Sequence, residues 1–353
     1  MISTDLESII IIFITSGALS FVSAPLFSCL FIPIAYKIGA IDVKNDGRRM
    51  HREPMARIGG CAVFAAMAVG IILFLTFCRE LFMGDELKTA AVLLLGGLFI
   101  TLGGLLDDIY TLSPAQKLLL QLGAATLCVI GGIRAPLFAL QGRLSPLFEE
   151  VLSSVGAALW CVLLTNAFNL IDGLDGLCGS SASFSFMALL MIGRWQELII
   201  LYPLCATLGF LPLNLRPAKL FLGDSGAMLL GYTLSVISMS VFENIEAPLS
   251  FGLIFALPLF DTAFAVCRRI LKGKNPFLPD REHLHHKLVD AGVPHGAASI
   301  LLALLGGGAA ALGVTWAIEG ATALSLISIM LLIFSAASVI MIINKSPRRE
   351  KKQ

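Results

Sequence analysis

The sequence is poor in charged side chains. Only 14% of its 353 residues are Asp, Glu, Lys or Arg, whereas the apolar set AVILMFWYC makes up 57%. This balance excludes an intrinsically disordered chain, a collagen, a coiled coil and an ordinary soluble α/β enzyme. The formal net charge is only +1, so no nucleic-acid partner recruited by bulk charge is expected. Mean hydropathy is +0.88, which favours a membrane protein.

Several other common features are absent. The eight cysteines lie in or beside apolar runs without CxxC spacing, which favours small buried side chains over a disulfide or metal framework. There is no long linker, internal repeat or low-complexity segment, so residues 1–353 are predicted to form a single membrane-embedded domain. The first apolar run lacks a basic leading segment and a small-residue cleavage site, so we expect a retained helix rather than a signal peptide.

The apolar runs predict an all-α polytopic membrane protein. A helix crosses a hydrocarbon core of about 30 Å with roughly 20 residues. Unbroken runs favour helices over barrel strands, whose side chains alternate. Eleven runs meet this description: 9–36, 58–78, 89–106, 117–133, 150–170, 178–193, 197–213, 225–242, 248–267, 297–317 and 321–343.

The basic residues predict the orientation of these helices. With the N-terminus outside, the inner segments and the C-terminal tail hold 20 Lys and Arg residues and the outer segments hold 5. Such a bias is typical of cytoplasmic loops. The predicted cytoplasmic segments are 37–57, 107–117, 171–178, 214–224, 268–296 and the tail 344–353.

The candidate functional residues all fall on this inner side: Asp107, Asp108, Asp172, Asp175, Asp224, His283, His285 and His286. Any one Asp at a helix end has an ordinary explanation as a solvated cap. Five of them from three loops on one face favour a site that takes a water-soluble reactant at the membrane surface.

The segment GGLLDDIYTLSPAQK places Asp107 and Asp108 at the end of one predicted helix and Lys117 at the start of the next. Adjacent helical residues point about 100° apart, so the two carboxylates are expected to have different partners. Lys117 is either a point charge for a phosphate or a lysine that reaches to the membrane interface.

The segment NAFNLIDGLDGLCG, residues 166–179, is the most informative. Asp172 and Asp175 share one face if the segment is helical, and nearby glycines allow a ligand to approach the backbone. Asn166 and Asn169 add neutral donors and acceptors. At the end of an apolar span, this pattern indicates a Mg²⁺–phosphate site, because Mg²⁺ is usually held by few carboxylates together with phosphates and water.

Three further segments leave alternatives open. GDSG at 223–226 is similar to the nucleophile segment of some serine proteases, but no Ser-His-Asp set supports a hydrolase, so Asp224 is expected to be a helix N-cap or metal ligand. The HLHH segment, 283–286, favours anion binding over zinc because no cysteines lie near it. Asp261 in PLFDT is equally compatible with a charge pair and with a catalytic role.

In this order, the motifs DD…K, NxxNxxDGxDGL, N…FLGDSG and HxHH resemble those of the polyprenyl-phosphate N-acetylhexosamine-1-phosphate transferases. The bacterial WecA/TagO branch is more similar than the MraY translocases, and the resemblance spans about 40–295. It implies transfer of a sugar-1-phosphate from a UDP-sugar to undecaprenyl phosphate, with release of UMP, at the cytoplasmic leaflet of a bacterial inner membrane. It also implies Mg²⁺, with Mn²⁺ as a substitute, and a homodimer. The HLHH form favours an unmodified N-acetylhexosamine donor, with UDP-GlcNAc as the default, in a reaction that initiates a cell-envelope glycan.

The resemblance also implies roles for individual residues. Asp175 and Asp224 match metal ligands, Lys117 matches a lysine on the diphosphate, and Asp107 and Asp108 match an acidic pair assigned to the lipid phosphate. Gly176, Asn214 and Phe221 match a uridine pocket, and His283, His285 and His286 match a loop that closes on the sugar phosphate. The expected site also includes Asp172 as a catalytic carboxylate and Asn169 as a substrate contact. The basic segment RRMHREPMARIGG matches too, although Ala56 replaces the usual proline.

Other functions and routes stay open from the sequence. The transfer is either a direct attack by the lipid phosphate or a two-step route through a phosphorylated Asp. The donor is alternatively UDP-GalNAc or UDP-MurNAc-pentapeptide. A polyprenyl-phosphate transporter without chemistry shares the polytopic fold, but such proteins more often show repeats and charges near the bilayer midplane.

Overall fold

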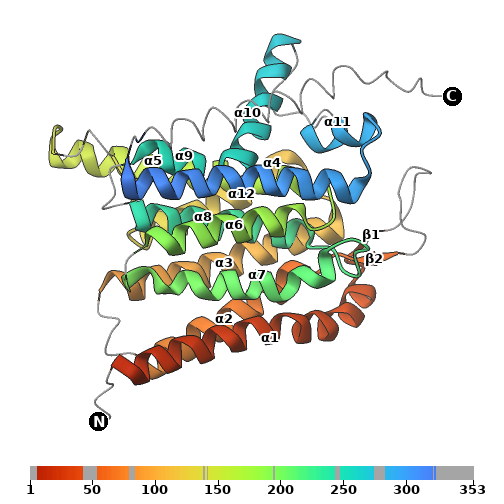
Figure 1. The fold of residues 1–353 in the computed structure, drawn as a ribbon, viewed down its shortest axis with the longest axis horizontal. Coiled ribbons are helices and arrows are strands. Elements are labelled where there is room, and N and C mark those ends of the chain that lie inside the picture. Colours follow the sequence, from red (N-terminus) through yellow and green to blue (C-terminus); the bar gives the residue numbers. More distant parts are fainter. Residues whose placement is uncertain are drawn as a thin grey trace.

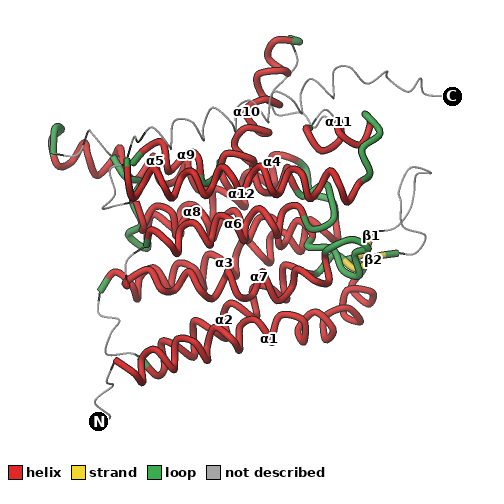
Figure 2. The backbone as a smooth tube through the Cα atoms, viewed as in Figure 1, coloured by secondary structure: helices red, strands yellow, loops and turns green. Residues whose placement is uncertain are grey.

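The computed structural model describes residues 6–42, 54–78, 84–137, 140, 142–193, 195–242, 247–273, 283–320 and 322. Helices dominate these residues, and two short antiparallel strands, β1 (Ile41–Asp42) and β2 (Met55–Ala56), form a small ribbon (Figure 2). The helices are α1 (Leu6–Ile38), α2 (Gly59–Phe77), α3 (Asp85–Tyr110), α4 (Pro114–Ile130), α5 (Pro146–Ile171), α6 (Leu177–Ile192), the 3₁₀ helix η3 (Trp195–Ile200), α7 (Leu201–Asn214), α8 (Gly223–Phe242), α9 (Pro248–Leu253), α10 (Ala256–Leu271), α11 (Leu284–Asp290) and α12 (His295–Glu319).

Six of the described helices are long and apolar enough to cross a membrane: α1, α2, α3, α5, α8 and α12. Three shorter apolar helices accompany them at 114–130, 177–192 and 198–214. The chain is therefore an all-helical, multi-pass membrane protein, as predicted. The total of eleven spans and the orientation of the termini stay predictions. The predicted span 321–343, apart from residue 322, and the basic tail 344–353 lie outside the described residues.

Helix α8 forms the centre of the bundle and is buried along almost its entire length, whereas α1 exposes much of its apolar surface. Helix α8 packs against α2, α3, α5 and α6. Glycines permit the closest approaches: a Cβ on Gly60 would lie 2.1 Å from the backbone nitrogen of Gly226, and one on Gly104 would lie 2.4 Å from Cα of Ser225. Small residues at such crossings let helix backbones pack tightly, and both crossings lie at the first turn of α8.

The helices run up and down, so that α1, α3, α5 and α7 end where α2, α4, α6 and α8 begin. Figure 1 shows β1, β2 and α11 at this same end of the bundle. Residues 39–42 and 54–58 and the turns 111–113, 172–176 and 215–222 therefore gather there, and we call this the site end. Within the predicted basic loops, residues 43–53 and 274–282 lie outside the described residues.

The predicted single helix 248–267 is wrong: the chain forms α9, a turn at Ile254 and Phe255, and then α10. Pro258 has no backbone N–H, so the Ile254 carbonyl four residues earlier has no helical donor. The Ser185 hydroxyl of α6 donates to that carbonyl instead, at 3.0 Å. Beyond the turn, α10 packs against α5 and α12, and its last turns project beyond the bundle (Figure 1).

Candidate active site

Asp108 connects the end of α3 to the beginning of α8. Its carboxylate accepts the backbone N–H groups of Asp224 and Ser225, at 2.9 and 3.0 Å. These are first-turn donors of α8 without helical partners, so the carboxylate caps that helix from outside. A Cβ on Gly223, whose φ is +76°, would lie 2.6 Å from Asp108 Oδ2, so this approach requires glycine. The Asp108 side chain is fully buried.

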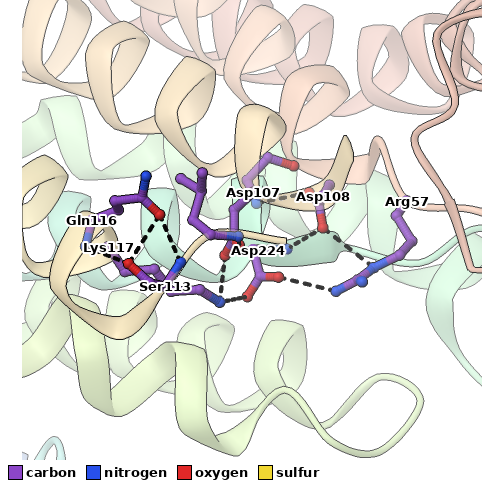
Figure 3. Close-up of polar contacts among 9 residues, drawn as sticks. Arg57, Asp107, Asp108, Ser113, Gln116, Lys117 and Asp224 are labelled. Carbon is purple, nitrogen blue, oxygen red and sulfur yellow. Dashed lines mark hydrogen bonds and ion pairs between the residues drawn. The ribbon is translucent and has the colours of Figure 1, made fainter. Parts of the chain in front are cut away.

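Asp107 has different partners, as the angular offset along the helix predicts. It accepts the Leu112 backbone N–H at 2.7 Å and forms an ion pair with Lys117. Lys117 is placed by a capping box in which Ser113 and Gln116 satisfy each other's backbone N–H groups at the start of α4. The tight α3–α4 turn thus brings the lysine back to the carboxylate (Figure 3).

Asp224 lies between the two cations of this cluster. Its Oδ1 is 3.6 Å from Lys117 Nζ, and its Oδ2 is 3.1 Å from Arg57 Nη2. Arg57 also pairs through Nε with Asp108, at 3.2 Å, and Figure 3 shows the resulting chain of alternating charges. The Asp224 side chain is 18% exposed, whereas those of Asp107 and Asp108 are 1% and 0% exposed. Asp224 is therefore the most accessible of the three carboxylates to a reactant.

Arg57 is the site residue that the sequence did not single out. Backbone pairing places it: its N–H donates to the Ala40 carbonyl at 2.9 Å, and Phe221 N–H donates to the Ala56 carbonyl at 3.0 Å. Gly59 N–H then donates to the Phe221 carbonyl at 3.1 Å. The sequence feature that could have identified Arg57 is its position as the last basic residue before an apolar span, in the RRMHREPMARIGG segment.

The turn between α5 and α6 carries Asp172 and Asp175. Burial raises the pKa of Asp172 to about 8, and the nearby carboxylates of Asp224 and Asp175 act in the same direction. Asp172 follows the last residue of α5, and Asn169 lies, partly exposed, in the final turn of that helix. The Asp172 carboxyl is therefore influenced both by Asp175 on its own turn and by Asp224 at the start of α8.

Two predicted uridine-pocket residues hold this turn in place. Gly176 has a φ of +74° and donates its N–H to Asn214 Oδ1 at 3.1 Å. The Asn214 amide in turn donates to the Leu220 carbonyl at 3.0 Å. Asn214 is buried and Phe221 is partly exposed. Ser299 of α12 binds the Asp175 carbonyl at 2.9 Å, which fixes the turn from the other side.

The described residues contain no group of three His, Cys, Asp or Glu side chains arranged to hold a metal ion by themselves. Mg²⁺ typically takes only one or two protein carboxylates and completes its shell with phosphate oxygens and water. Asp224 is partly exposed and already attracts two cationic groups, and its charge acts on the turn that carries Asp175. Carboxylate oxygens such as those of Asp175 and Asp224 are the kind of donor that a hard divalent cation prefers.

The three predicted histidines lie on and beside α11. His283 and His285 are buried and His286 is partly exposed. The rings of His283 and His285 are stacked with centroids 5.8 Å apart, and those of His285 and His286 are 4.2 Å apart. Burial, followed by the charge of His286, lowers the pKa of His285 to about 3, so this imidazole is neutral at physiological pH.

Comparison with known proteins identifies relatives of this chain. A model described as glycosyl transferase family 4 matches residues 90–242. The probable undecaprenyl-phosphate N-acetylglucosaminyl 1-phosphate transferase of Bacillus subtilis is 35% identical over 285 residues, covering 77% of this chain and 76% of the relative. The undecaprenyl-phosphate alpha-N-acetylglucosaminyl 1-phosphate transferase of Escherichia coli K12 is 32% identical, covering 83% and 82%.

A third relative, the decaprenyl-phosphate N-acetylglucosaminephosphotransferase of Mycolicibacterium smegmatis, is 30% identical over 302 residues and covers 77% of this chain and 74% of its own length. The matched family segment begins in α3 and ends with α8, so it contains Asp107, Asp108, Lys117 and Asp224. The chain therefore belongs to the polyprenyl-phosphate N-acetylhexosamine-1-phosphate transferase family, within glycosyl transferase family 4, and is a membrane-embedded sugar-phosphate transferase.

Proposed function

We propose that this protein transfers N-acetylglucosamine-1-phosphate from UDP-GlcNAc to undecaprenyl phosphate in a Mg²⁺-dependent reaction. The products are undecaprenyl-diphosphate-GlcNAc and UMP, formed at the cytoplasmic face of a bacterial inner membrane as the first step of a cell-envelope glycan. The names of the relatives support the sugar and the polyprenyl acceptor, and the concentration of basic residues on the predicted inner side supports the cytoplasmic face.

One observation carries the proposal: the partly exposed Asp224 carboxylate is flanked by Lys117 and Arg57, which are in turn held by buried carboxylates. Phosphoryl transfer depends mainly on neutralising charge and on in-line positioning. A cluster whose cations are fixed before substrate arrives meets that requirement, because little reorganisation is needed during the reaction.

The roles of the carboxylates follow from exposure and partners. Asp175 and Asp224 would hold Mg²⁺, which when bound would offset the charge of the donor diphosphate. Asp107 keeps Lys117 directed at Asp224, where its ammonium group would bind a diphosphate oxygen. Asp108 fixes Arg57 and the N-terminus of α8.

The acceptor phosphate needs little activation. Its second pKa is near 6, so it is mostly dianionic at neutral pH and requires a positioner more than a base. The assignment of Asp107 and Asp108 to this phosphate stays a prediction. Both carboxylates are buried and paired with Arg57 and Lys117, so a lipid phosphate would meet these cations together with them.

The direct test incubates membranes containing the protein with labelled UDP-GlcNAc, undecaprenyl phosphate and Mg²⁺. We expect Mg²⁺-dependent release of UMP together with a new butanol-soluble label, and neither product when Mg²⁺ is chelated. A panel with UDP-GalNAc and UDP-MurNAc-pentapeptide tests the donor. Movement of the polyprenyl phosphate across the membrane without any transfer of label would contradict the proposal and favour a transporter.

A further inference from the structure

Asp261 of α10 is a buried carboxylate outside the charge cluster of the candidate active site. Its side chain is 3% exposed, and both of its oxygens are engaged. Oδ2 lies 2.7 Å from His283 Nδ1, and Oδ1 accepts the backbone N–H of Leu284 at 2.9 Å. One carboxylate thus holds both the histidine side chain and the first residue of α11.

This contact helps to fix the position of α11, which also packs through its buried Leu288 in an apolar cluster with α12. Helix α11 has only seven residues, and helices this short gain most of their stability from tertiary contacts. Its N-cap residue, His283, makes no side-chain capping hydrogen bond, so Asp261 supplies an acceptor and a negative charge at the helix N-terminus from another element.

The opposite side of the histidine cluster touches the acidic turn. His285 packs against Gly173, where a Cβ would lie only 2.1 Å from His285 Nε2. The stacked rings of His283 and His285 therefore link Asp261 to the turn that carries Asp172 and Asp175. His286 adjoins His285 and is partly exposed, so it is the histidine of this group best placed to meet a solvent-borne anion.

We propose that Asp261 is a positioning residue that holds His283 as its Nδ1–H tautomer and fixes α11 on the 172–176 turn, so that His286 is presented to the phosphates of the donor. The inference rests on the proposed function for the identity of that anion. An ionised carboxylate at Nδ1 requires a proton on that nitrogen, and the same logic orients functional histidines in many enzymes.

A double-mutant cycle tests whether Asp261 acts through His283. Asp261→Asn keeps the shape of the side chain and an acceptor for Leu284 but removes the charge, and we expect kcat/KM to fall about ten- to a hundredfold, the range for losing the carboxylate partner of a metal-bound histidine. The variant carrying both Asp261→Asn and His283→Asn should be no worse than His283→Asn alone. Asp290→Asn, at the exposed last residue of α11, is the matched control and should retain normal activity.

Activity of Asp261→Asn within about twofold of the unmutated protein, or additive losses in the double variant, would overturn the inference. A second measurement does not depend on activity: ¹⁵N NMR of the histidine-labelled, unmutated protein in detergent, with the His283→Asn variant used only to assign the resonances. We expect the resonances that disappear in His283→Asn to report protonated Nδ1, and a neutral ring protonated only at Nε2 would overturn the inference. If no donor in the panel supports transfer, the proposed function fails while the NMR result still decides the Asp261–His283 contact.

Discussion

The two ends of the helix bundle both carry charged residues, yet they use them differently. At the site end, Arg57, Lys117, Asp107, Asp108 and Asp224 share partners across four segments of the chain, and two of the carboxylates are buried. At the opposite end, Arg134 pairs with Glu150 at 2.8 Å, and these side chains are 32% and 62% exposed. Arg134 also donates to the carbonyls of Val129 and Ile133, at 2.8 and 3.1 Å, which completes the end of α4.

The comparison teaches that charge at a helix end is not by itself evidence of function. The opposite end even contains a cavity of about 190 Å³ lined partly by Lys88 and Arg134. An exposed ion pair contributes about 0–1 kcal/mol, whereas removing one partner of a buried pair costs about 3–5 kcal/mol. Burial and shared partners therefore distinguish the candidate active site, and paired substitutions at the two ends test that distinction.

The largest difference is expected for the carboxylates. Asp224→Asn should abolish transfer, a fall of at least about 10³-fold in turnover, because it removes the accessible negative charge that lies between two cations. Glu150→Gln at the opposite end should leave turnover within about twofold. UMP release by purified variants, with insertion checked by detergent extraction, measures both. Near-normal turnover of Asp224→Asn would show that this carboxylate is not part of the reaction.

The next difference concerns the arginines. Arg57→Gln leaves Asp108 buried without its cation. Because the Arg57 side chain is itself 32% exposed, the cost is below that of a fully buried pair, and we expect a loss of about 1–3 kcal/mol in the free energy of unfolding and about a hundredfold fall in kcat/KM. Arg134→Gln should change the free energy of unfolding by less than about 1 kcal/mol. Thermal unfolding in detergent compares them, and equal destabilisation by the two substitutions would remove the basis for the comparison.

Lysines give a smaller contrast, in donor affinity. Lys117→Ala should weaken binding of UDP-GlcNAc about tenfold, because one fixed cation near the diphosphate is lost. Lys88→Ala, at the opposite end, should leave the affinity unchanged. Calorimetric titration with Mg²⁺ present measures both affinities. An unaltered affinity in Lys117→Ala would show that this lysine does not bind the donor and only reaches to the membrane interface.

The smallest effect is a pH dependence of stability at Asp172. Its pKa is about 8 when folded and about 3.9 when unfolded, so between these values the folded chain holds a proton that the unfolded chain has released. Raising the pH through this window therefore favours unfolding. Asp172→Asn mimics the protonated form, so in Mg²⁺-free buffer its apparent Tm should exceed that of the unmutated protein by a few degrees at pH 8 and by less at pH 5. A pH-independent difference would contradict the assignment.

The sequence predicted which acidic residues lie at helix ends better than it predicted their contacts, and the side of the membrane on which they lie stays a prediction. Asp107, Asp108, Asp172, Asp175 and Asp224 follow from helix ends and topology, both of which are local features. The pairing of Arg57 with Asp224 joins residues 167 positions apart through irregular backbone, for which no periodicity exists. The division of 248–267 into α9 and α10 was missed because the prediction used apolar composition alone, which does not show that Pro258 removes a helical hydrogen bond.

The histidine segment shows the same limit. Its composition indicated anion binding, but the exposure and partners of the three rings depend on packing against Gly173 and Asp261. Gly173 lies in the turn between α5 and α6, and Asp261 lies inside α10. Tertiary contacts of this kind determine which member of a motif is exposed, and the motif alone does not encode them.

The most direct test of the account asks whether a divalent cation binds at the site end. Electron paramagnetic resonance of Mn²⁺ added to the purified protein with UDP-GlcNAc would detect it through coupling to the ³¹P nuclei of the diphosphate. We predict one tightly bound Mn²⁺ per chain, lost in Asp224→Asn and in Asp175→Asn but retained in Glu150→Gln. Unchanged Mn²⁺ binding in both aspartate variants, or none in the unmutated protein with donor present, would contradict it.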